Sequence, residues 1–587
     1  MARIPSPFAS SSSGSLPTWW PPYPSERLPL FRPLGAAALE SLTVFDQQLL
    51  GLDRHWGYIL ALDPRSGDLK VLNPRLAPQL RDTYALTVES GSPGYLWVAK
   101  EQALYRIPWT DLGSATQLDP YQVCLLPYAI ESLSMGEDGL YASCFQREKI
   151  LRLDATSGTI VQQLAAPGVG REQIQVAGEV IWVSDRIEET VYVLDRQSGE
   201  SLARILTPFP SPTGLVFWQN QWLVAYATEE PYIRDNPNDP EPLSVDFRNK
   251  TLIAPLSLHP PSLYPLPEPA PIIRSAPACS LHFFPQVLGS RASYTLSSGY
   301  RLELTYLEEF AQEEPVAVPH LVWKIALPCH SPRQKVHSVR SIGDPFQLEQ
   351  QFGQQVAVFD LGSIQPGECR IFGWKAVMDV FSIKYLITPA DVEDAVLPED
   401  LKARYLVDDD YLAMDTAVVR EAARQAVGRE TNLLRKMARI REFVYDKLSY
   451  RVTPRIEPPD VVLQNGYGSC GEYVGLLLAL ARLNGIVCRT VGRYKCPPHP
   501  ELRGIPLLPE YNHVWIEFYV PGWGWVPMES NPDDLGDRPY PERYFMGIPW
   551  THAEIAKGIP FETCNAEDAS IGQLAINHVQ FRILDEL

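Results

Sequence analysis

A cysteine stands between a glycine-rich loop and an apolar segment in the last third of the chain. The loop Asn465–Ser469 reads Asn-Gly-Tyr-Gly-Ser, Cys470 follows it, and residues 474–485 are nearly all apolar up to a closing Asn-Gly. An apolar stretch that ends in this way predicts a buried helix. We expect Cys470 in the first turn of that helix, where the helix dipole favours a thiolate over a thiol. Gly468 and Gly471 are expected to let a substrate backbone approach closely.

A histidine and a carboxylate follow on two segments that have the pattern of strands. His513 lies in the run Tyr511–Tyr519, and Glu529 ends the run Trp525–Glu529 after a Gly-Trp-Gly turn. Neighbouring antiparallel strands can set His513 beside an acidic residue of the second strand. A thiolate, an imidazole and a carboxylate are groups that together perform nucleophilic acyl transfer. Asn531 is a second candidate for the third residue, because asparagine has this role in papain-like sites.

Four stretches in this order resemble the transglutaminase-like superfamily of papain-type thiol enzymes. The resemblance covers about residues 395–550, and the stretches are Gly468-Ser469-Cys470, Leu483-Asn484-Gly485-Ile486, His513-Val514-Trp515 and Gly524-Trp525-Val526-Pro527. It implies that Cys470 is the nucleophile and that His513 is the general base. The third residue of the family is an aspartate, usually followed by proline, whereas this chain has Glu529 followed by Ser530. The sequence around Cys470 is also similar to the Gly-x-Cys-Gly-Glu-Trp of peptide N-glycanases.

The resemblance implies cysteine-dependent acyl transfer on the peptide or carboxamide groups of a protein or peptide substrate, through a thioester. Hydrolysis, by a protease or amidase of the transglutaminase-like type, is the expected outcome. A protein-crosslinking transglutaminase and a peptide N-glycanase-like amidase are alternatives. A non-catalytic protein-interaction scaffold is a third, because Glu529 replaces the family's aspartate. No cofactor is expected, and no metal site either, since the chain has no Cys-x-x-Cys pair.

The N-terminal half of the chain contains a repeat. The pattern Leu-Asp-x-x-Ser-Gly begins at Leu62, Leu153 and Leu194, and a degenerate copy begins at Ile107, so that successive copies are 41 to 46 residues apart. This period is typical of four-stranded propeller blades, in which a strand ends in an Asp/Ser/Gly hairpin turn. We expect residues 38–254 to form an all-β, propeller-like domain, which would be a platform for a protein partner rather than a place of chemistry.

Two further domains are expected after the repeats. Apolar and polar residues alternate from Tyr300 to Tyr306, which predicts a half-buried strand. We expect a β-sandwich over residues 280–392, and it resembles the domain that often precedes the thiol domain in bacterial members. Residues 393–587 are expected to form the α+β, papain-like catalytic domain, with an amphipathic helix from Leu433 to Leu448.

Proline marks the segments between these domains. The chain has 55 prolines in 587 residues, and they are dense in residues 1–37, expected to be a disordered arm, and in 255–279, expected to be a linker. A net charge of −19 argues against binding to nucleic acid. No apolar run is long enough to predict a membrane span. Sparse cysteines and the lack of a signal-peptide pattern lead us to expect a cytoplasmic protein.

Overall fold

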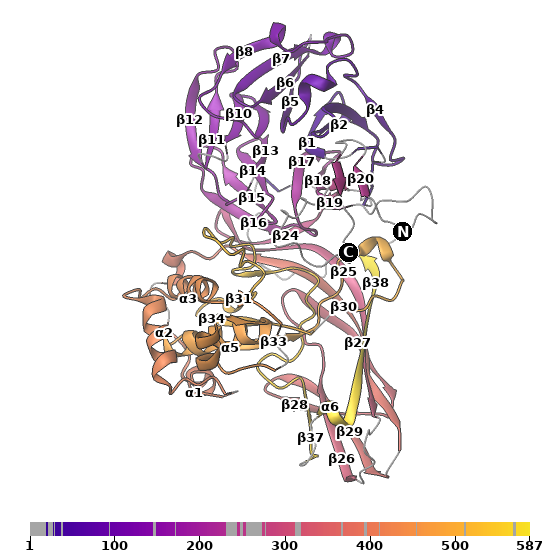
Figure 1. The fold of residues 1–587 in the computed structure, drawn as a ribbon, viewed down its shortest axis with the longest axis vertical. Coiled ribbons are helices and arrows are strands. Elements are labelled where there is room, and N and C mark those ends of the chain that lie inside the picture. Colours follow the sequence, from indigo (N-terminus) through magenta and orange to yellow (C-terminus); the bar gives the residue numbers. More distant parts are fainter. Residues whose placement is uncertain are drawn as a thin grey trace.

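The structure is a computed structural model of the 587-residue chain (Figure 1). It describes residues 19–20, 28, 30–33, 35–36, 39–92, 94–144, 148–170, 172–229, 244–246, 251–253, 273–275, 278–310, 318–365, 368–392, 396–409, 411–452, 455–509, 512–566 and 571–587. The chain is mostly β-structure with few helices, and it divides into several parts, as predicted. Among the described residues no helix has both the length and the apolar character needed to cross a bilayer.

Five antiparallel sheets fill the N-terminal end of the molecule (Figure 1). The first two contain β1 (Leu39–Phe45), β2 (Gln48–Asp53), β3 (Tyr58–Leu62) and β4 (Leu69–Val71), then β5 (Ala85–Glu89), β6 (Tyr95–Lys100), β7 (Ala103–Pro108) and β8 (Gln122–Leu125). The next two contain β9 (Ser132–Gly136), β10 (Gly139–Cys144), β11 (Lys149–Leu153) and β12 (Ile160–Ala165), then β13 (Glu172–Ala177), β14 (Val180–Asp185), β15 (Thr190–Asp195) and β16 (Ser201–Leu206). The fifth contains β17 (Pro212–Trp218), β18 (Gln221–Tyr226) and β23 (Ala278–Leu281). The first strand of each sheet contacts the first strand of the next, and β1 contacts β17. We call this closed arrangement the ring.

The repeated sequence pattern forms the turn between the third and fourth strands of three ring sheets. The carboxylates of Asp63, Asp154 and Asp195 accept hydrogen bonds from the backbone N–H groups two and three residues further on, at 2.7–3.4 Å. The closing glycine of each copy has a φ between +70° and +76°, a left-handed conformation that favours glycine. The repeat therefore specifies a turn once in each of these sheets.

Segments outside the expected repeat domain also belong to the ring. β23 pairs with β18, so Ala278 and Cys279, at the end of the expected linker, are part of the fifth sheet. The repeat region supplies only β17 and β18 to this sheet, which would leave one edge of β18 unpaired. β23 pairs with this edge and so removes an open strand edge. Two short ladders pair β19 (Thr228–Glu229) with β22 (Ile273–Ser275) and β20 (Ser244–Asp246) with β21 (Thr251–Ile253). The rest of the linker 255–279 lies outside the described residues.

The described part of the expected N-terminal arm packs on the ring. Trp19 meets Trp182 edge-on, with ring centroids 6.0 Å apart, and Trp20 meets Phe283 at 5.3 Å. Phe31 forms a backbone bridge with Ala278. These aromatic side chains lose water-exposed surface on the ring, which favours an ordered path for this part of the segment. Residues 1–18 lie outside the described residues.

Two larger sheets form the other end of the molecule. The first contains β24 (Phe283–Leu288), β25 (Arg291–Phe310), β30 (Arg370–Tyr385) and β27 (Gln334–Gly343), with β36 (Gly547–Ile548) on β30 and β38 (Ala575–Glu586) on β25. The second contains, in spatial order, β28 (Gln347–Gln351), β29 (Gln354–Ile364), β26 (Val318–Ala326) and β37 (Glu562–Cys564). Alternate residues of β25, such as Leu302 and Leu304, are buried in the core between the sheets, so the predicted strand alternation is confirmed. We call this part the two-sheet region. Its strands β36, β37 and β38 come from the segment 393–587. Backbone pairing therefore crosses the domain boundary that the sequence led us to expect at residue 392.

The helices, except α6 (Ile571–Leu574) beside the strands of the two-sheet region, lie together on one side of the lower half in Figure 1. They are α1 (Glu399–Tyr405), α2 (Ala417–Val427), α3 (Leu433–Lys447), α4 (Pro459–Asn465) and α5 (Cys470–Leu483), and α6 precedes β38. Helix α5 packs on a sheet with the order β33 (Cys488–Arg493), β34 (His513–Val520) and β35 (Gly524–Met528), and α2, α3 and α4 pack on α5. The short strand β31 (Ser449–Tyr450) pairs with β32 (Tyr467–Gly468). We call residues 399–546 and 549–561 the α/β region. The predicted amphipathic helix is α3, and the predicted buried helix is α5, which contacts α2, α3, α4 and β34.

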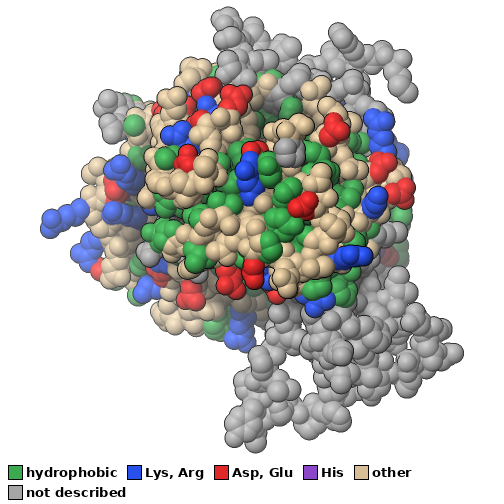
Figure 2. Space-filling view, turned by 90° about the horizontal axis from the view of Figure 1, so that it is seen from above, with side chains coloured by type: hydrophobic (Ala, Val, Ile, Leu, Met, Phe, Trp, Pro, Cys, Tyr) green, Lys and Arg blue, Asp and Glu red, His purple; other side chains and the backbone are tan. Residues whose placement is uncertain are grey.

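The far end of the ring carries apolar, basic and acidic side chains. Seen from above (Figure 2), apolar, basic and acidic side chains are interspersed over this face.

Candidate active site

Cys470 is the first residue of α5, as the sequence predicts. Ser469 and Glu472 form a reciprocal capping box at this helix end. The backbone N–H and the hydroxyl of Ser469 both donate to Glu472 Oε2, at 2.8 and 2.6 Å. The Cys470 side chain is half-buried, and its Sγ lies 3.9 Å from the carbonyl oxygen of Asn512. The cap therefore fixes the start of the helix and with it the thiol.

The two glycines beside Cys470 make room for the chain itself. A Cβ at Gly468 would lie 2.5 Å from the Glu472 Cβ, and a Cβ at Gly471 would lie 2.9 Å from Cδ1 of Ile456. Both distances are too short for carbon atoms that do not share a bond. Close packing of the capping box therefore accounts for Gly468, and the exposed Ile456 side chain lies over Gly471. The expected approach of a substrate backbone to these glycines stays a prediction.

His513 and Glu529 meet at the end of two paired strands. His513 is the first residue of β34, Glu529 directly follows β35, and the register pairs Ile516 with Met528. His513 Nε2 lies 2.6 Å from Glu529 Oε1. Both side chains are buried, with 3% and 1% of their surface exposed. The predicted placement of an acidic residue beside His513 is confirmed.

A second histidine, which the sequence did not single out, binds the same carboxylate oxygen. His552 Nε2 lies 2.5 Å from Glu529 Oε1, and its Nδ1 lies 3.0 Å from Thr551 Oγ1. The ring of His552 packs edge-on against Trp515, with centroids 4.9 Å apart. His552 lies on an irregular loop after β36, so no strand or helix period connects it to the site. Only the tertiary fold places His552 beside Glu529.

Burial and charge together set the protonation of the three residues. Burial raises the pKa of Glu529, but the charges and hydrogen bonds of the two histidines outweigh burial and hold that pKa well below its ordinary value. Burial lowers the pKa of His513, but the Glu529 charge and hydrogen bonds to Cys470 and Glu529 outweigh it, so the pKa is raised. At His552 burial dominates and lowers the pKa to about 3. Near neutral pH Glu529 is therefore ionised and His552 is uncharged.

These charge states fix where the protons are. An ionised carboxylate only accepts hydrogen bonds, so His513 and His552 both present an N–H at Nε2 to Glu529. His513 Nδ1 is buried and has no hydrogen-bond partner within reach among the described atoms, although the Cys470 side chain acts on this ring and raises its pKa. In neutral His513 this nitrogen carries the lone pair. It is the atom that can take a proton from Cys470.

Arg333 of the two-sheet region holds the loop that carries His552. Its Nη1 donates to the His552 carbonyl oxygen at 2.9 Å and to Glu554 Oε1 at 3.0 Å. Its Nη2 donates to the Pro549 carbonyl oxygen at 2.8 Å, and its Nε donates to that of Phe381 at 2.7 Å. Because Arg333 is fully buried, these bonds fix the loop on both sides of His552.

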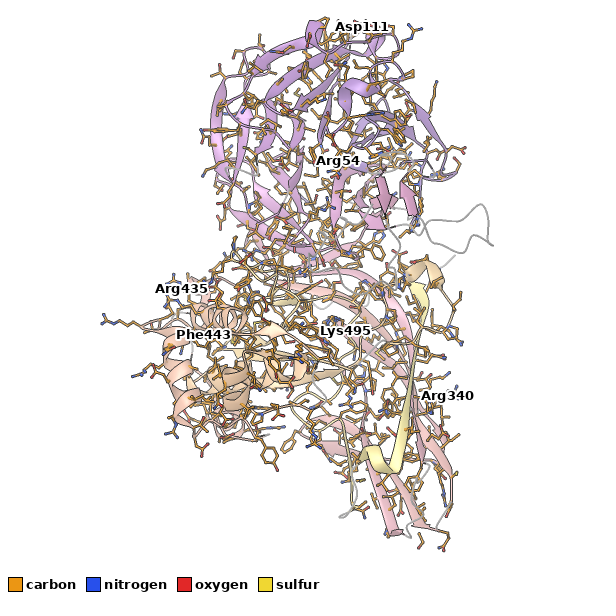
Figure 3. The ribbon with its side chains drawn as sticks, in the orientation of Figure 1. Arg54, Asp111, Arg340, Arg435, Phe443 and Lys495 are labelled. Carbon is orange, nitrogen blue, oxygen red and sulfur yellow. The ribbon has the colours of Figure 1, made fainter. Side chains whose placement is uncertain are left out.

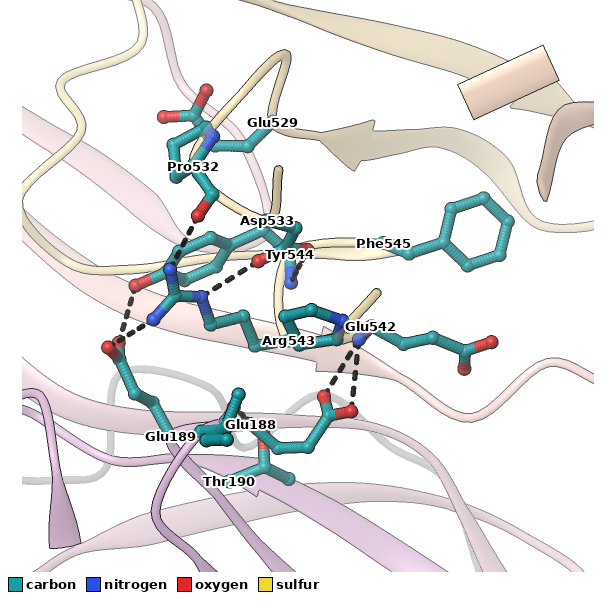
Figure 4. Close-up of polar contacts among 12 residues, drawn as sticks. Glu188, Glu189, Thr190, Glu529, Pro532, Asp533, Glu542, Arg543, Tyr544 and Phe545 are labelled. Carbon is teal, nitrogen blue, oxygen red and sulfur yellow. Dashed lines mark hydrogen bonds and ion pairs between the residues drawn. The ribbon is translucent and has the colours of Figure 1, made fainter. Parts of the chain in front are cut away.

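A turn of the ring also reaches the α/β region, as Figure 4 shows. Glu188 and Glu189 lie between β14 and β15. The Glu188 carboxylate accepts the backbone N–H of Glu542, at 2.9 and 3.1 Å. Glu189 forms an ion pair with Arg543 and accepts the hydroxyl of Tyr544 at 2.7 Å. The ring is thus bound to the loop 542–544 by the carboxylates of buried Glu188 and half-buried Glu189.

Arg543 extends this contact to the segment after Glu529 (Figure 4). Its Nη2 donates to the Pro532 carbonyl oxygen at 2.6 Å, and its Nε donates to Asp533 Oδ1 at 2.7 Å. Arg441 of α3 donates to the other oxygen of Asp533 at 3.1 Å. Asp533 is almost completely buried. The segment that follows Glu529 is therefore held between the ring and the helices.

Asn531, the second candidate for the third residue, has a different partner. Its Oδ1 accepts the hydroxyl of Ser530 at 2.9 Å, and its side chain is half-buried. Since Glu529 binds His513 Nε2, the geometry favours Glu529 as the third residue, which orients the imidazole of His513.

His513, Glu529 and His552 also have the donor set of a metal site. Their ligand atoms lie within 4.8 Å of one another, and zinc is often bound by two histidines and a glutamate. Two hydrogen bonds to Glu529 already explain the short distances. The ammonium group of Lys495, 3.9 Å from Glu529 Oε1, opposes a second cation. We therefore treat the three residues as a hydrogen-bonded chain.

Two cavities lie next to the three hydrogen-bonded residues His513, Glu529 and His552. One, of about 520 Å³, is lined by Asn512, by Tyr494 and by residues of β25 and β38. The other, of about 380 Å³, is lined by Glu529 and His552 on one side and by residues of the ring on the other. A larger cavity, of about 670 Å³, lies between the two-sheet region and the sheet of β34, away from Cys470.

Comparison with known proteins identifies the part of the chain that holds Cys470 and His513. Residues 420–530 match the family model of the transglutaminase-like superfamily, so the chain contains a domain of this superfamily. A candidate cysteine protease from Cytophaga hutchinsonii has a similar structure, with 16% identity, a TM-score of 0.37, and coverage of 50% of this chain and 93% of its own. The glutaminyl cyclase of Myxococcus xanthus is similar over 34% of this chain and 90% of its own, with 11% identity and a TM-score of 0.26. No curated protein matches the sequence.

Proposed function

We propose that the chain is a cysteine-dependent acyl-transfer enzyme of the transglutaminase-like type, with Cys470 as nucleophile, His513 as general base and Glu529 as the residue that orients His513. One observation carries this proposal. The thiol at the start of α5 faces a histidine whose second nitrogen is bound to a buried, ionised glutamate. This is the order of groups that activates a thiol nucleophile.

The proposed reaction begins with a proton transfer. His513 Nδ1 takes the proton of the Cys470 thiol, and the thiolate attacks the carbonyl carbon of a carboxamide or peptide bond. The carbonyl oxygen becomes an oxyanion, for which the backbone N–H of Cys470 is the natural first donor. The imidazolium then protonates the leaving nitrogen as the C–N bond breaks, and a thioester to Cys470 remains. Glu529 stabilises the imidazolium throughout.

Hydrolysis is the outcome that we propose for this thioester. Water gives up a proton to His513, attacks the thioester carbonyl and releases the acid, and Cys470 regains its proton. If a lysine amine attacked in place of water, the same thioester would give a crosslink between proteins. The two outcomes differ only in the second nucleophile, so the assay must measure both.

We further propose that the ring is a five-bladed propeller and that the two-sheet region is a sandwich, with both serving to bring protein or peptide substrates to the thiol. The closed contact of β1 with β17 supports the first assignment, and the shared core of the two large sheets supports the second. We keep 38–254, 280–392 and 393–587 as the domain limits proposed from the sequence, extended by β23 for the ring and by β36, β37 and β38 for the two-sheet region. All nine cysteines are free thiols, which supports a reducing compartment such as the cytoplasm.

Two assays run side by side test the proposal. One follows cleavage of profluorescent peptide amides, and the other follows incorporation of a fluorescent amine into a glutamine-containing protein. We expect cleavage by the wild-type chain and none by Cys470→Ala. Amine incorporation without cleavage would make the chain a transglutaminase, and inactivity of the folded wild type over a broad peptide library would favour the scaffold.

A further inference from the structure

The ring and the α/β region build a cavity together beside the proposed catalytic residues. It measures about 380 Å³, and Glu529 and His552 line it. The ring contributes Glu189 and the segment 207–210. Seven of the lining residues are prolines, which have rigid apolar rings and no backbone N–H group. The prolines offer apolar contact, and polar side chains such as Thr207, Tyr544 and Thr551 line other parts of the cavity.

Lys495 brings a cation to this cavity, and its ion pair with Glu529 is a loose one. Its Nζ lies 3.9 Å from Glu529 Oε1, which is beyond hydrogen-bond distance. That oxygen already accepts bonds from His513 and His552. The Lys495 side chain is 33% exposed, and a backbone bridge to His552 fixes its position. Figure 3 places Lys495 between the helices and the long strands.

The other charged groups that line the cavity are engaged. Arg543 is paired with Glu189 and Asp533. His499 Nδ1 lies 3.2 Å from Glu501 Oε1. Lys495 is therefore the cation of this cavity with the loosest pairing, and its charge is complementary to a carboxylate.

We propose that this cavity is a substrate subsite for an acidic side chain, so that the substrate class is peptides with Asp or Glu near the scissile bond. The carboxylate would bind Lys495 Nζ, and the methylene groups would pack on the prolines. This inference rests on the proposed function and deepens it. Because the chain as a whole carries a charge of −19, an acidic peptide gains nothing from long-range attraction. Its recognition must depend on Lys495 itself.

Binding measurements test the subsite without any need for turnover. Fluorescent peptides carry one Glu, or in a matched set one Gln, at each position on either side of a central amide, and their anisotropy is measured with the Cys470→Ala chain. At one or more positions we expect the Glu peptide to bind roughly tenfold more tightly than the Gln peptide. A second substitution, Lys495→Gln, is expected to bring the ratio of the two affinities to one. Lys495→Glu is expected to make the Gln peptide the tighter binder. Lys402→Gln, which removes an exposed cation of α1, serves as the control and is expected to leave the ratio unchanged.

The outcomes separate this inference from the proposed function. A Glu-to-Gln ratio near one at every position, or a ratio that survives Lys495→Gln, overturns the subsite. If the wild-type chain cleaves the peptides and the ratio is one, the proposed function stands and the subsite fails. If the Glu preference depends on Lys495 but no peptide or amine is ever turned over, the acidic-peptide site stands and the proposed function fails.

Discussion

His552 and His513 donate to a single oxygen atom, Oε1 of Glu529, at 2.5 and 2.6 Å. The carboxylate is therefore held in place by a histidine that has no contact with Cys470 in the described structure. Arg333 holds the backbone of His552 in turn, at 2.9 Å. This series of contacts makes His552 a positioning residue for the proposed reaction, since it acts on His513 only through Glu529.

Replacement of His552 tests this role. We expect His552→Phe to lower kcat by roughly tenfold to a hundredfold, because a buried carboxylate loses a hydrogen-bond donor. KM should change little, and the His513 limb of the pH profile should move to higher pH, because Glu529 then binds one proton donor fewer. His552→Gln keeps an N–H donor and should recover part of the loss. A folded His552→Phe variant with the kcat and pH profile of the wild type would contradict this role.

The pH profile of kcat/KM tests the link between Glu529 and His513. The carboxylate raises the pKa of His513, so the limb of the profile that reports His513 should lie above the ordinary histidine value of 6.5. Glu529→Gln removes the negative charge, which should shift this limb to lower pH and reduce kcat/KM by about a hundredfold or more. Glu517→Gln, on the same sheet but paired with Arg489, is the control. The same limb in the wild type and in Glu529→Gln would show that the carboxylate does not set the pKa of His513.

Acid stability should reveal the uncharged state of His552. Its pKa is about 3 in the folded chain and near 6.5 when unfolded, so between these values only the unfolded state binds the proton. The free energy of unfolding should then fall as pH drops from 6.5 toward 3, by about 1.4 kcal/mol per pH unit. Glu529, with its lowered pKa, adds a loss of the same sign below about 4.5. Urea unfolding at pH 7, 6 and 5 should show a shallower slope for His552→Gln, and equal slopes would contradict the assignment.

Alkylation should single out Cys470 among the nine thiols. Burial raises the pKa of Cys488 and Cys329 to about 12, so these thiols should react slowly with iodoacetamide at pH 7. Exposed Cys369 gives the rate of an accessible thiol. We expect Cys470 to react several times faster than Cys369 by mass spectrometry, and His513→Ala to remove this difference. If Cys470 reacted no faster than Cys369, His513 would not be activating it.

The ring contact should matter for the geometry of the site. Glu189→Gln breaks a half-buried ion pair with Arg543, which should lower the free energy of unfolding by roughly 2 kcal/mol. It should also lower kcat severalfold, because Arg543 holds the segment after Glu529. Glu179→Gln, on a side chain of the ring that is 73% exposed, is the matched control. Unchanged kcat in Glu189→Gln would mean that the ring does not support the site.

Local chemistry in the sequence was enough to predict the core of the site. A helix start at Cys470 follows from a glycine loop and an apolar run that closes in Asn-Gly, both of which act within a few residues. His513 and Glu529 belong to adjacent strands joined by a short turn, so their meeting could be predicted from alternation and turn chemistry. The repeated Leu-Asp-x-x-Ser-Gly turn likewise showed the period of the ring sheets.

Contacts between distant segments could not be predicted in this way. His552 is on an irregular loop, and its place depends on Arg333, more than two hundred residues earlier in the chain. β38 closes an edge of β25 although almost three hundred residues separate them. The ring meets the α/β region through Glu188 and Glu189, whose sequence context is that of an ordinary polar turn. In each case the partner is selected by tertiary packing, which leaves no periodic trace in the sequence.

The central claim is that Cys470 forms a thioester with its substrate. Rapid acid quench of the wild-type chain with a peptide amide, followed by proteolysis and mass spectrometry, measures this intermediate. We predict that the peptide containing Cys470 gains the mass of the acyl group and loses it again as the product acid appears, and that Cys470→Ala neither forms an adduct nor turns over substrate. Turnover that persists in Cys470→Ala, or an acyl group found on another residue, would contradict the account.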